Sequence, residues 1–159
     1  MKNISKKLTA ALIVGIFVIT SLQAKAHCEI PCGIYGDSVR IALLYEHIET
    51  IEKSMNQINE LSKAETPDYN QLVRWVMNKE EHAKKIQEIV SQYFLHQRVK
   101  PTSSADDAAY RKYVKQLELL HHISVFAMKS KQSTDLGIID TLRDKVHLFE
   151  HAYFDEHKH

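Results

Sequence analysis

The chain has 159 residues, of which 21 are lysine or arginine and 20 are aspartate or glutamate. Charges this evenly balanced give no sign of a polyanion-binding surface, so we expect no nucleic acid among the partners. The short alternating runs bounded by turn residues that are typical of strands are missing from the sequence. The composition therefore excludes a β architecture and favours an all-α protein.

Residues 1–26 have the organisation of a cleaved export signal. Lysines give the segment a basic start, an apolar stretch runs from Leu8 to Leu22, and Ala24 and Ala26 are the small residues required at −3 and −1. The apolar stretch is about 15 residues long, whereas a membrane span needs about 20. A lipoprotein signal is disfavoured because His27, and not a small residue, precedes the first cysteine.

Cleavage after Ala26 implies signal peptidase as a partner and leaves no stable membrane anchor. We therefore expect an exported protein, periplasmic or extracellular. The remaining 133 residues (159 minus 26) have the size of one ordinary domain. The signal carries four of the basic residues and no acids, so the mature chain has 17 basic and 20 acidic side chains, or about −3 overall.

The mature chain opens with a segment that we call the hook, residues 27–37, which offers an unusual set of metal donors. The freed amine of His27, the backbone nitrogen and thiolate of Cys28 and the thiolate of Cys32 can surround one metal ion. A plane of two nitrogens and two sulfurs indicates nickel(II) or copper(II) rather than zinc. The His27 imidazole can serve as an axial ligand, and Tyr35 can stand over an open face as a gate or hydrogen-bond donor.

These donors also favour redox chemistry, because thiolates and a deprotonated amide stabilise a trivalent metal. Two alternatives stay open at this point. Cys28 and Cys32 could form a disulfide in an exported helical protein that binds a protein partner. The same ligands could instead serve a non-catalytic carrier of nickel or copper. The adjoining His27 and the cleavage site favour the metal over the disulfide, and a c-type haem is excluded because there is no C-x-x-C-H.

Two amphipathic helices are predicted after the hook. We expect Asp37 or Ser38 to cap the first. Its apolar stripe consists of Ile41, Leu44, Ile48, Ile51, Met55 and Ile58. The second is expected to begin at Thr66 as the cap residue, followed by Pro67 at the first helical position. Its stripe consists of Leu72, Val76, Ala83, Ile86, Val90 and Tyr93.

Residues 100–104 form a predicted connector, with Ser104 able to cap a third helix. The third stripe consists of Tyr110, Tyr113, Val114, Leu117, Leu120 and Met128. Residues 133–135 are expected to start a fourth helix, and its stripe consists of Leu136, Ile139, Leu142, Val146 and Phe149. Short connections between long helices favour antiparallel neighbours, so the sequence predicts an all-α, antiparallel up-down four-helix bundle preceded by the hook.

The hook is similar to the metal hook of nickel-containing superoxide dismutase. The residue types match at His27, Cys28, Pro31, Cys32, Gly33 and Tyr35. A weaker resemblance extends through the bundle, and residues 72–83 are similar to the second helix of that family. The chain is thereby interpreted as a signal peptide, residues 1–26, and a dismutase domain, residues 27–159, with its bundle at about 38–156.

The resemblance implies an oxidoreductase that converts superoxide to oxygen and hydrogen peroxide, with one nickel ion per subunit cycling between +2 and +3. It also implies a homohexamer. His27, Cys28 and Cys32 would be the metal ligands, Tyr35 would guard substrate access, and Arg74 would lie near the axial histidine.

The chain departs from the family pattern at several positions. Glu29 stands where aspartate is common. Ala42 and Leu43 occupy the positions closest to a glutamate that some members use to hydrogen-bond the axial imidazole network. The nearby carboxylates, Glu46 and Glu49, are not assigned that role. Outside the hook, His147 and His151 are spaced i and i+4, and we interpret them as a solvated surface pair.

Overall fold

The computed structural model describes residues 36–104 and 107–154. Its elements are α2 (Asp37–Leu61), α3 (Tyr69–Glu88), the π-helical segment η1 (Ile89–Arg98), α4 (Asp107–Gln132) and α5 (Leu136–Phe154). No strand occurs among these residues. Within the same ranges, no helix is both long enough and apolar enough to cross a membrane. The predicted signal segment and residues 27–35 of the hook lie outside the described residues.

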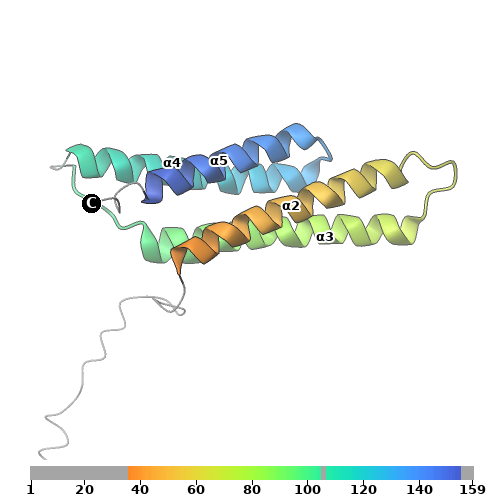
Figure 1. Ribbon diagram of the computed structural model, residues 1–159, viewed down its shortest axis with the longest axis horizontal. Coiled ribbons are helices and arrows are strands. Elements are labelled where there is room, and N and C mark those ends of the chain that lie inside the picture. The colour runs from red at the N-terminus through yellow and green to blue at the C-terminus, as the bar shows by residue number, and fades with distance from the viewer. Residues whose placement is uncertain (1–35, 105–106, 155–159) are drawn as a thin grey trace, which may run out of the picture.

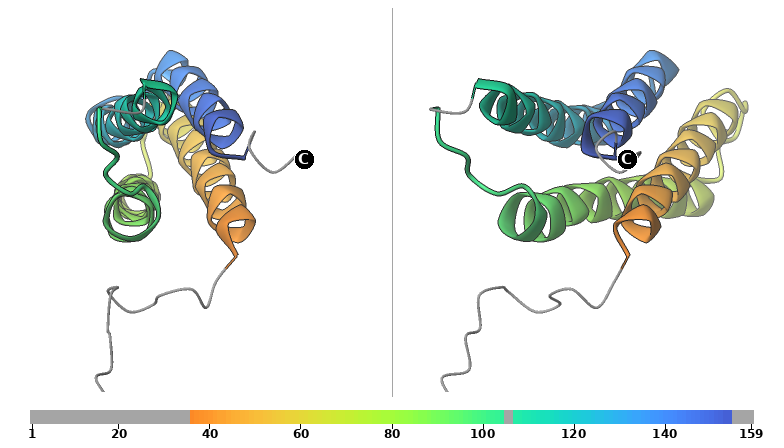
Figure 2. Two further views of the ribbon diagram at one scale, coloured as in Figure 1. Left: turned by 90° about the vertical axis from the view of Figure 1, so that its left-hand side faces the viewer. Right: turned by 60° about the vertical axis from the view of Figure 1, so that its left-hand side comes forward.

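The four α-helices form an antiparallel bundle, which confirms the predicted fold. α2 packs against α3 and α5, and α4 packs against the same two helices from the other side. Figure 1 shows α2 beside α3 and α4 beside α5, with the chain reversing at each connection. The views in Figure 2 show that the two pairs close around a common interior.

The interior is built from the apolar stripes of α2 and α5 much as the sequence predicts. All six residues of the α2 stripe are buried, and so are four of the five of the α5 stripe, with Leu136 partly buried against the core. Phe94 and Phe149 are fully buried, with their rings edge to face at a centroid distance of 4.9 Å. Contacts of this kind add to the free energy that burial of the rings contributes.

The predicted stripe of α3 is confirmed from Ala83 to Tyr93 but not at Val76, and half of the predicted stripe of α4 needs correction. Val76 on α3 is exposed, and on α4 so are Tyr110, Val114 and Met128. The side of α4 that is buried carries Gln116, Leu119, Leu120, Ile123, Ala127 and Ser130. α4 packs against α3 and η1 as well as α5, and its apolar residues cover more than one face, so periodicity alone did not select the correct side.

Two of the predicted helix starts are wrong. α2 begins at Asp37 after Gly36, and no side chain caps it, because the Asp37 carboxylate is engaged elsewhere. α3 begins at Tyr69, two residues later than predicted, because Asp68 adopts the extended cap conformation and its carboxylate accepts a 3.1 Å hydrogen bond from the Gln71 amide. The predicted cap at Ser104 stays a prediction, because residues 105–106 lie outside the described ranges.

A buried lysine joins α3 to the end of α4. Lys79 is 3 % exposed, and its ammonium donates hydrogen bonds to the carbonyl oxygens of Ser130 (2.7 Å), Lys131 (2.5 Å) and Ser133 (3.2 Å). These carbonyls lie at the negative end of the α4 dipole, where a cation is favoured. Burial lowers the pKa of Lys79, yet the three acceptors satisfy all three of its protons.

Candidate functional site

The predicted site residues fall on both sides of the boundary of the described chain. His27, Cys28, Cys32 and Tyr35 lie outside the described residues, and Arg74 lies inside them. The description begins at Gly36, one residue after Tyr35. The surroundings of Gly36 therefore form the end of the bundle from which the hook extends.

A four-residue cluster fixes the first residue of α2 at this end. The Asp37 carboxylate accepts hydrogen bonds from the Tyr93 hydroxyl at 2.5 Å, the Arg98 guanidinium at 2.6 Å and the Tyr153 hydroxyl at 2.7 Å. Tyr93 and Arg98 belong to η1, and Tyr153 belongs to α5. Two elements, η1 and α5, thus hold the start of α2, where the hook joins the bundle.

The electrostatics of the cluster keep Asp37 ionised and the phenols protonated. Burial on its own raises the pKa of the Asp37 carboxyl, but the hydrogen bonds from Tyr93, Arg98 and Tyr153 outweigh burial and lower that pKa. Burial and the bond to Asp37 raise the pKa of Tyr93 to about 12, and burial likewise raises the pKa of Tyr153. At neutral pH the cluster is one carboxylate with three donors.

The π-helical geometry of η1 brings two of these donors to Asp37. η1 continues α3 without a break, and its last turn closes with a 2.8 Å bond from the Val99 amide to the Phe94 carbonyl, five residues back. A π-helix of this length is rare, and such segments are frequent at functional sites. The predicted second helix extends through this region, but nothing in the sequence pattern indicated the π form.

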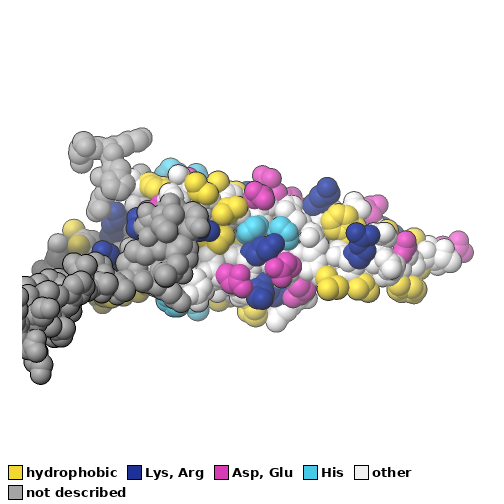
Figure 3. All heavy atoms as spheres, turned by 90° about the horizontal axis from the view of Figure 1, so that it is seen from below, with side chains coloured by type: hydrophobic (Ala, Val, Ile, Leu, Met, Phe, Trp, Pro, Cys, Tyr) yellow, Lys and Arg dark blue, Asp and Glu magenta, His cyan; other side chains and the backbone are white. Residues whose placement is uncertain are grey.

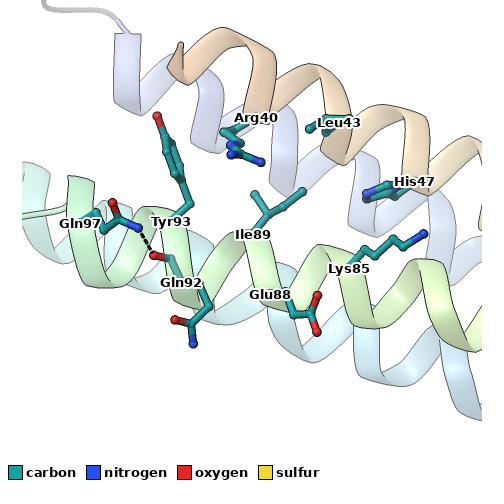
Figure 4. Close-up of a pocket in the computed structure, with 9 residues that line it drawn as sticks. All are labelled: Arg40, Leu43, His47, Lys85, Glu88, Ile89, Gln92, Tyr93 and Gln97. Carbon is teal, nitrogen blue, oxygen red and sulfur yellow. Dashed lines mark hydrogen bonds between the residues drawn. The ribbon is translucent and has the colours of Figure 1, made fainter. Parts of the chain in front are cut away.

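A groove of about 470 Å³ runs between α2 and the α3–η1 helix, starting beside the cluster. Figure 4 shows side chains from both walls. Its lining includes Arg40, Leu43 and His47 from α2, with Lys85, Ile89 and Tyr93 from the opposite wall. Arg40 also stacks over the Tyr93 ring, 5.0 Å from its centroid. The groove therefore combines apolar side chains with two basic ones and one carboxylate, Glu88.

Two histidines meet across this face of the bundle. The Nδ1 atoms of His47 on α2 and His82 on α3 are 3.1 Å apart, and the rings are edge to face with centroids separated by 4.9 Å. Burial lowers the pKa of both rings, and the nearby Lys85 lowers them further, so both are neutral at pH 7. Figure 3 shows histidine side chains gathered with basic and acidic ones on the face formed by α2 and α3.

Sequence reasoning missed this histidine pair. The two residues are 35 positions apart on different helices, so no local spacing connects them. The weak signal was that His47 lies three positions after Leu44 and four before Ile51, and so shares the face of the apolar stripe of α2. His147 and His151, in contrast, are exposed as expected, with ring centroids 4.4 Å apart.

Arg74 lies far from the start of α2. It is exposed on the N-terminal half of α3, beside Trp75 and Asn78. α3 runs antiparallel to α2, and Arg74 lies eight residues, or about 12 Å, beyond the His82 level in the direction away from Gly36. The structure therefore does not bring Arg74 next to the hook attachment within one chain.

The described residues contain no group of three or more His, Cys, Asp or Glu side chains that could hold a metal ion. Both cysteines of the chain lie outside them.

The chain was compared with known proteins. Residues 22–158 match the family described as nickel-containing superoxide dismutase. The matched segment includes the hook and all four helices of the bundle. Comparison with the curated proteins and with the solved structures gives no match.

Proposed function

The chain belongs to the nickel-containing superoxide dismutase family and is a nickel-dependent oxidoreductase acting on superoxide, and we propose that the metal is bound and changes valence at a mature N-terminus beginning at His27. The observation that supports this most is the position of the donor set. His27, Cys28 and Cys32 lie inside the matched segment and directly after a sequence that fits signal peptidase.

The chemistry of these donors fits nickel. The amine of His27, the amide nitrogen of Cys28 and the thiolates of Cys28 and Cys32 would hold the ion, because strong nitrogen and sulfur donors of this kind suit nickel(II). The His27 imidazole would supply a further donor. Bound there, nickel supplies the one-electron exchange by which two superoxide anions and two protons give oxygen and hydrogen peroxide. Cysteines that bind a metal as thiolates cannot at the same time form a disulfide. The family match therefore favours a catalytic nickel site over a Cys28–Cys32 disulfide and over a non-catalytic metal carrier.

The described residues contribute by positioning the hook. Asp37 holds the first turn of α2 against η1 and α5 through three charged or phenolic donors. The hook therefore extends from a fixed point, and a fixed attachment reduces the entropy lost when a loop orders around a metal. In this proposal Tyr35, next to Gly36, guards the approach of superoxide.

We further propose cleavage after Ala26, export to the periplasm or the extracellular space, and assembly as a homohexamer. Large apolar side chains on α3 support self-association, since Tyr69, Val73 and Met77 are each more than half exposed and follow one another at four-residue spacing. The N-terminal mass of the exported protein and its molar mass in solution, measured by sedimentation, test the cleavage and the assembly.

The decisive experiment compares mature chains that begin at His27 and at Ala26. In the longer chain the nitrogen of His27 is an amide and no longer an amine, so the metal loses one good donor. Both chains should show the same helix content by circular dichroism, but only the His27 chain should turn over superoxide rapidly after nickel loading. Equal turnover at equal nickel content would show that the terminal amine is not a ligand.

A further inference from the structure

The groove beside the Asp37 cluster has the position of a receptor for the hook. It begins at Tyr93, which also binds the first residue of α2, and it extends along α2 as far as His47. Figure 4 shows the Tyr93 and His47 side chains at its two ends. A segment attached at Gly36 is therefore already at the mouth of this groove.

The length of the hook matches the length of the groove. Cys32 is four residues before Gly36, so even an extended chain keeps it within about 14 Å of that residue. His47 is ten residues beyond Asp37, or about 15 Å along α2. His27 is held beside Cys32 when both bind one metal, so its imidazole comes within reach of His47.

The chemistry of the two surfaces is complementary. A nickel(II) ion bound by one amidate and two thiolates carries one net negative charge, and Glu29 adds another. The lining carries two cations, Arg40 and Lys85, against one carboxylate, Glu88, so it keeps a net positive charge. Leu43 and Ile89 offer apolar surface to Ile30 and Pro31. Opposite charges and apolar contact both favour this occupant.

The histidine pair offers a matched hydrogen-bond partner at the end of the groove. One Nδ1 donates to the other, so one ring presents a free Nε2 acceptor and the other an Nε2–H donor. Among the described residues no hydrogen bond is formed by either Nε2. His47 lines the groove, and its contact with His82 couples the tautomers of the two rings.

We propose that residues 27–35 dock in this groove of their own chain and that His47, oriented by His82, holds the His27 imidazole by a hydrogen bond. The inference rests on the proposed function of the hook. His47 is then a positioning residue, and it takes the place for which neither Ala42 nor Leu43 has a suitable side chain. Nothing in the groove needs to change protonation for this role.

The test follows the ring nitrogens of ¹⁵N-labelled mature protein by nuclear magnetic resonance while nickel(II) is added. We expect the His47 ring and the Leu43 and Ile89 amides to shift, and the rings of His147 and His151 on α5 to stay unchanged. Nickel content and superoxide turnover are measured on the same sample. Nickel binding and turnover with an unmoved groove would overturn the docking and leave the function intact, whereas absence of nickel binding would overturn both.

Variants at the pair separate positioning from folding. His47→Leu should keep nickel and lower turnover about tenfold, in the range found for partners of metal ligands. His47→Gln retains a hydrogen-bonding side chain and should recover part of the rate, and His147→Leu is the control. Normal turnover in His47→Leu would overturn the role of His47, and so would a loss that His47→Gln does not reduce.

A mixed sample tests whether docking occurs within one chain. Labelled Cys28→Ser/Cys32→Ser chains, which lack the thiolates, are refolded together with unlabelled wild-type chains and nickel. We expect the labelled His47 ring to stay unmoved, because its own hook is empty. A shift of that ring would place the hook in the groove of a second copy and overturn docking within the chain.

Discussion

Two charged side chains, the partly buried Asp37 and the buried Lys79, stabilise opposite parts of the bundle, and their surroundings differ in kind. Asp37, the last residue of the hook and the first of α2, accepts hydrogen bonds from three side chains of two other elements. Lys79, toward the other end, donates to three backbone carbonyls at the end of α4. The Asp37 contacts hold a segment that leaves the fold, whereas the Lys79 contacts close the fold upon itself. We therefore expect changes near Asp37 to affect chemistry and changes near Lys79 to affect stability.

Substitution of the sulfur ligands should separate chemistry from stability most sharply. Cys28→Ser and Cys32→Ser should each abolish tight nickel binding and superoxide turnover, because hydroxyls are poor donors for this metal. The free energy of unfolding of the bundle should be unchanged, since its core is built from the helices. Metal analysis, turnover and urea unfolding of the mature variants measure all three. Near-normal turnover in either variant would remove the hook from the mechanism.

Lys79→Met should act in the opposite sense. It leaves three carbonyls at the end of α4 without their donor, which should lower the free energy of unfolding by about 2 kcal/mol. Turnover per folded, nickel-loaded chain should stay close to that of the wild type. Lys84→Met, an exposed lysine on the same helix, is the control for loss of charge. A loss of turnover in folded, nickel-loaded Lys79→Met would contradict the expectation that changes near Lys79 affect stability alone.

Asp37→Asn tests whether the attachment of the hook affects both superoxide turnover and the free energy of unfolding. The substitution weakens three charged or phenolic hydrogen bonds and should cost about 1–2 kcal/mol at pH 7, with reduced turnover at full nickel content. The pKa of the Asp37 carboxyl is lowered in the folded state. The contribution of Asp37 to the free energy of unfolding is therefore complete above the unfolded pKa of about 3.9 and is lost as pH falls below that value. The difference in stability between wild type and variant should therefore shrink in urea titrations at pH 3.

The exposed Asp144→Asn is the matched control, because its partner Lys145 is an immediate neighbour on the surface of α5. That substitution should change stability by less than about 0.5 kcal/mol. If Asp37→Asn is equally mild, the cluster does not hold the first turn of α2.

The parts of the molecule that could be predicted are those in which residues close together in the sequence are enough to determine the structure or the chemistry. The stripes of α2 and α5 repeat at helical spacing and bury a single face, so their core residues followed from the sequence. The residues of the hook are adjacent in the chain, so its donor set could be predicted from residue types alone. Both cases depend on neighbours along the chain.

The parts that could not be predicted depend on contacts between distant segments. α4 has apolar side chains on two faces, and only its packing on α3 and α5 decides that Ile123 is buried and Val114 exposed. The cap of α3 required a choice between Thr66 and Asp68, which both suit that position. His47 and His82 meet only after α2 and α3 pair, and the same is true of Asp37 and Tyr153.

Substitution of Arg74 is the last test of the difference between the Asp37 end and the Lys79 end of the bundle. Arg74 lies toward the Lys79 end, where we expect no chemistry, so an effect on turnover would contradict that division. Its neighbours Val73 and Met77 belong to the exposed apolar row of α3. If that row is covered by another subunit in a hexamer, we predict that Arg74 reaches the hook of a neighbouring copy, where its guanidinium orients the hook by charge-assisted hydrogen bonds. Arg74→Ala should then retain nickel and lower turnover about tenfold.

Arg111→Ala, an exposed arginine on α4, is the control for loss of surface charge. The molar mass of each variant shows whether the assembly persists, so that a loss of turnover from dissociation is separated from a loss of orientation. A tenfold loss in an intact assembly would mean that the far end of one chain contributes to the metal site of the next. An unchanged rate would make Arg74 an ordinary surface charge and would confine the chemistry to the end of the bundle that holds Asp37.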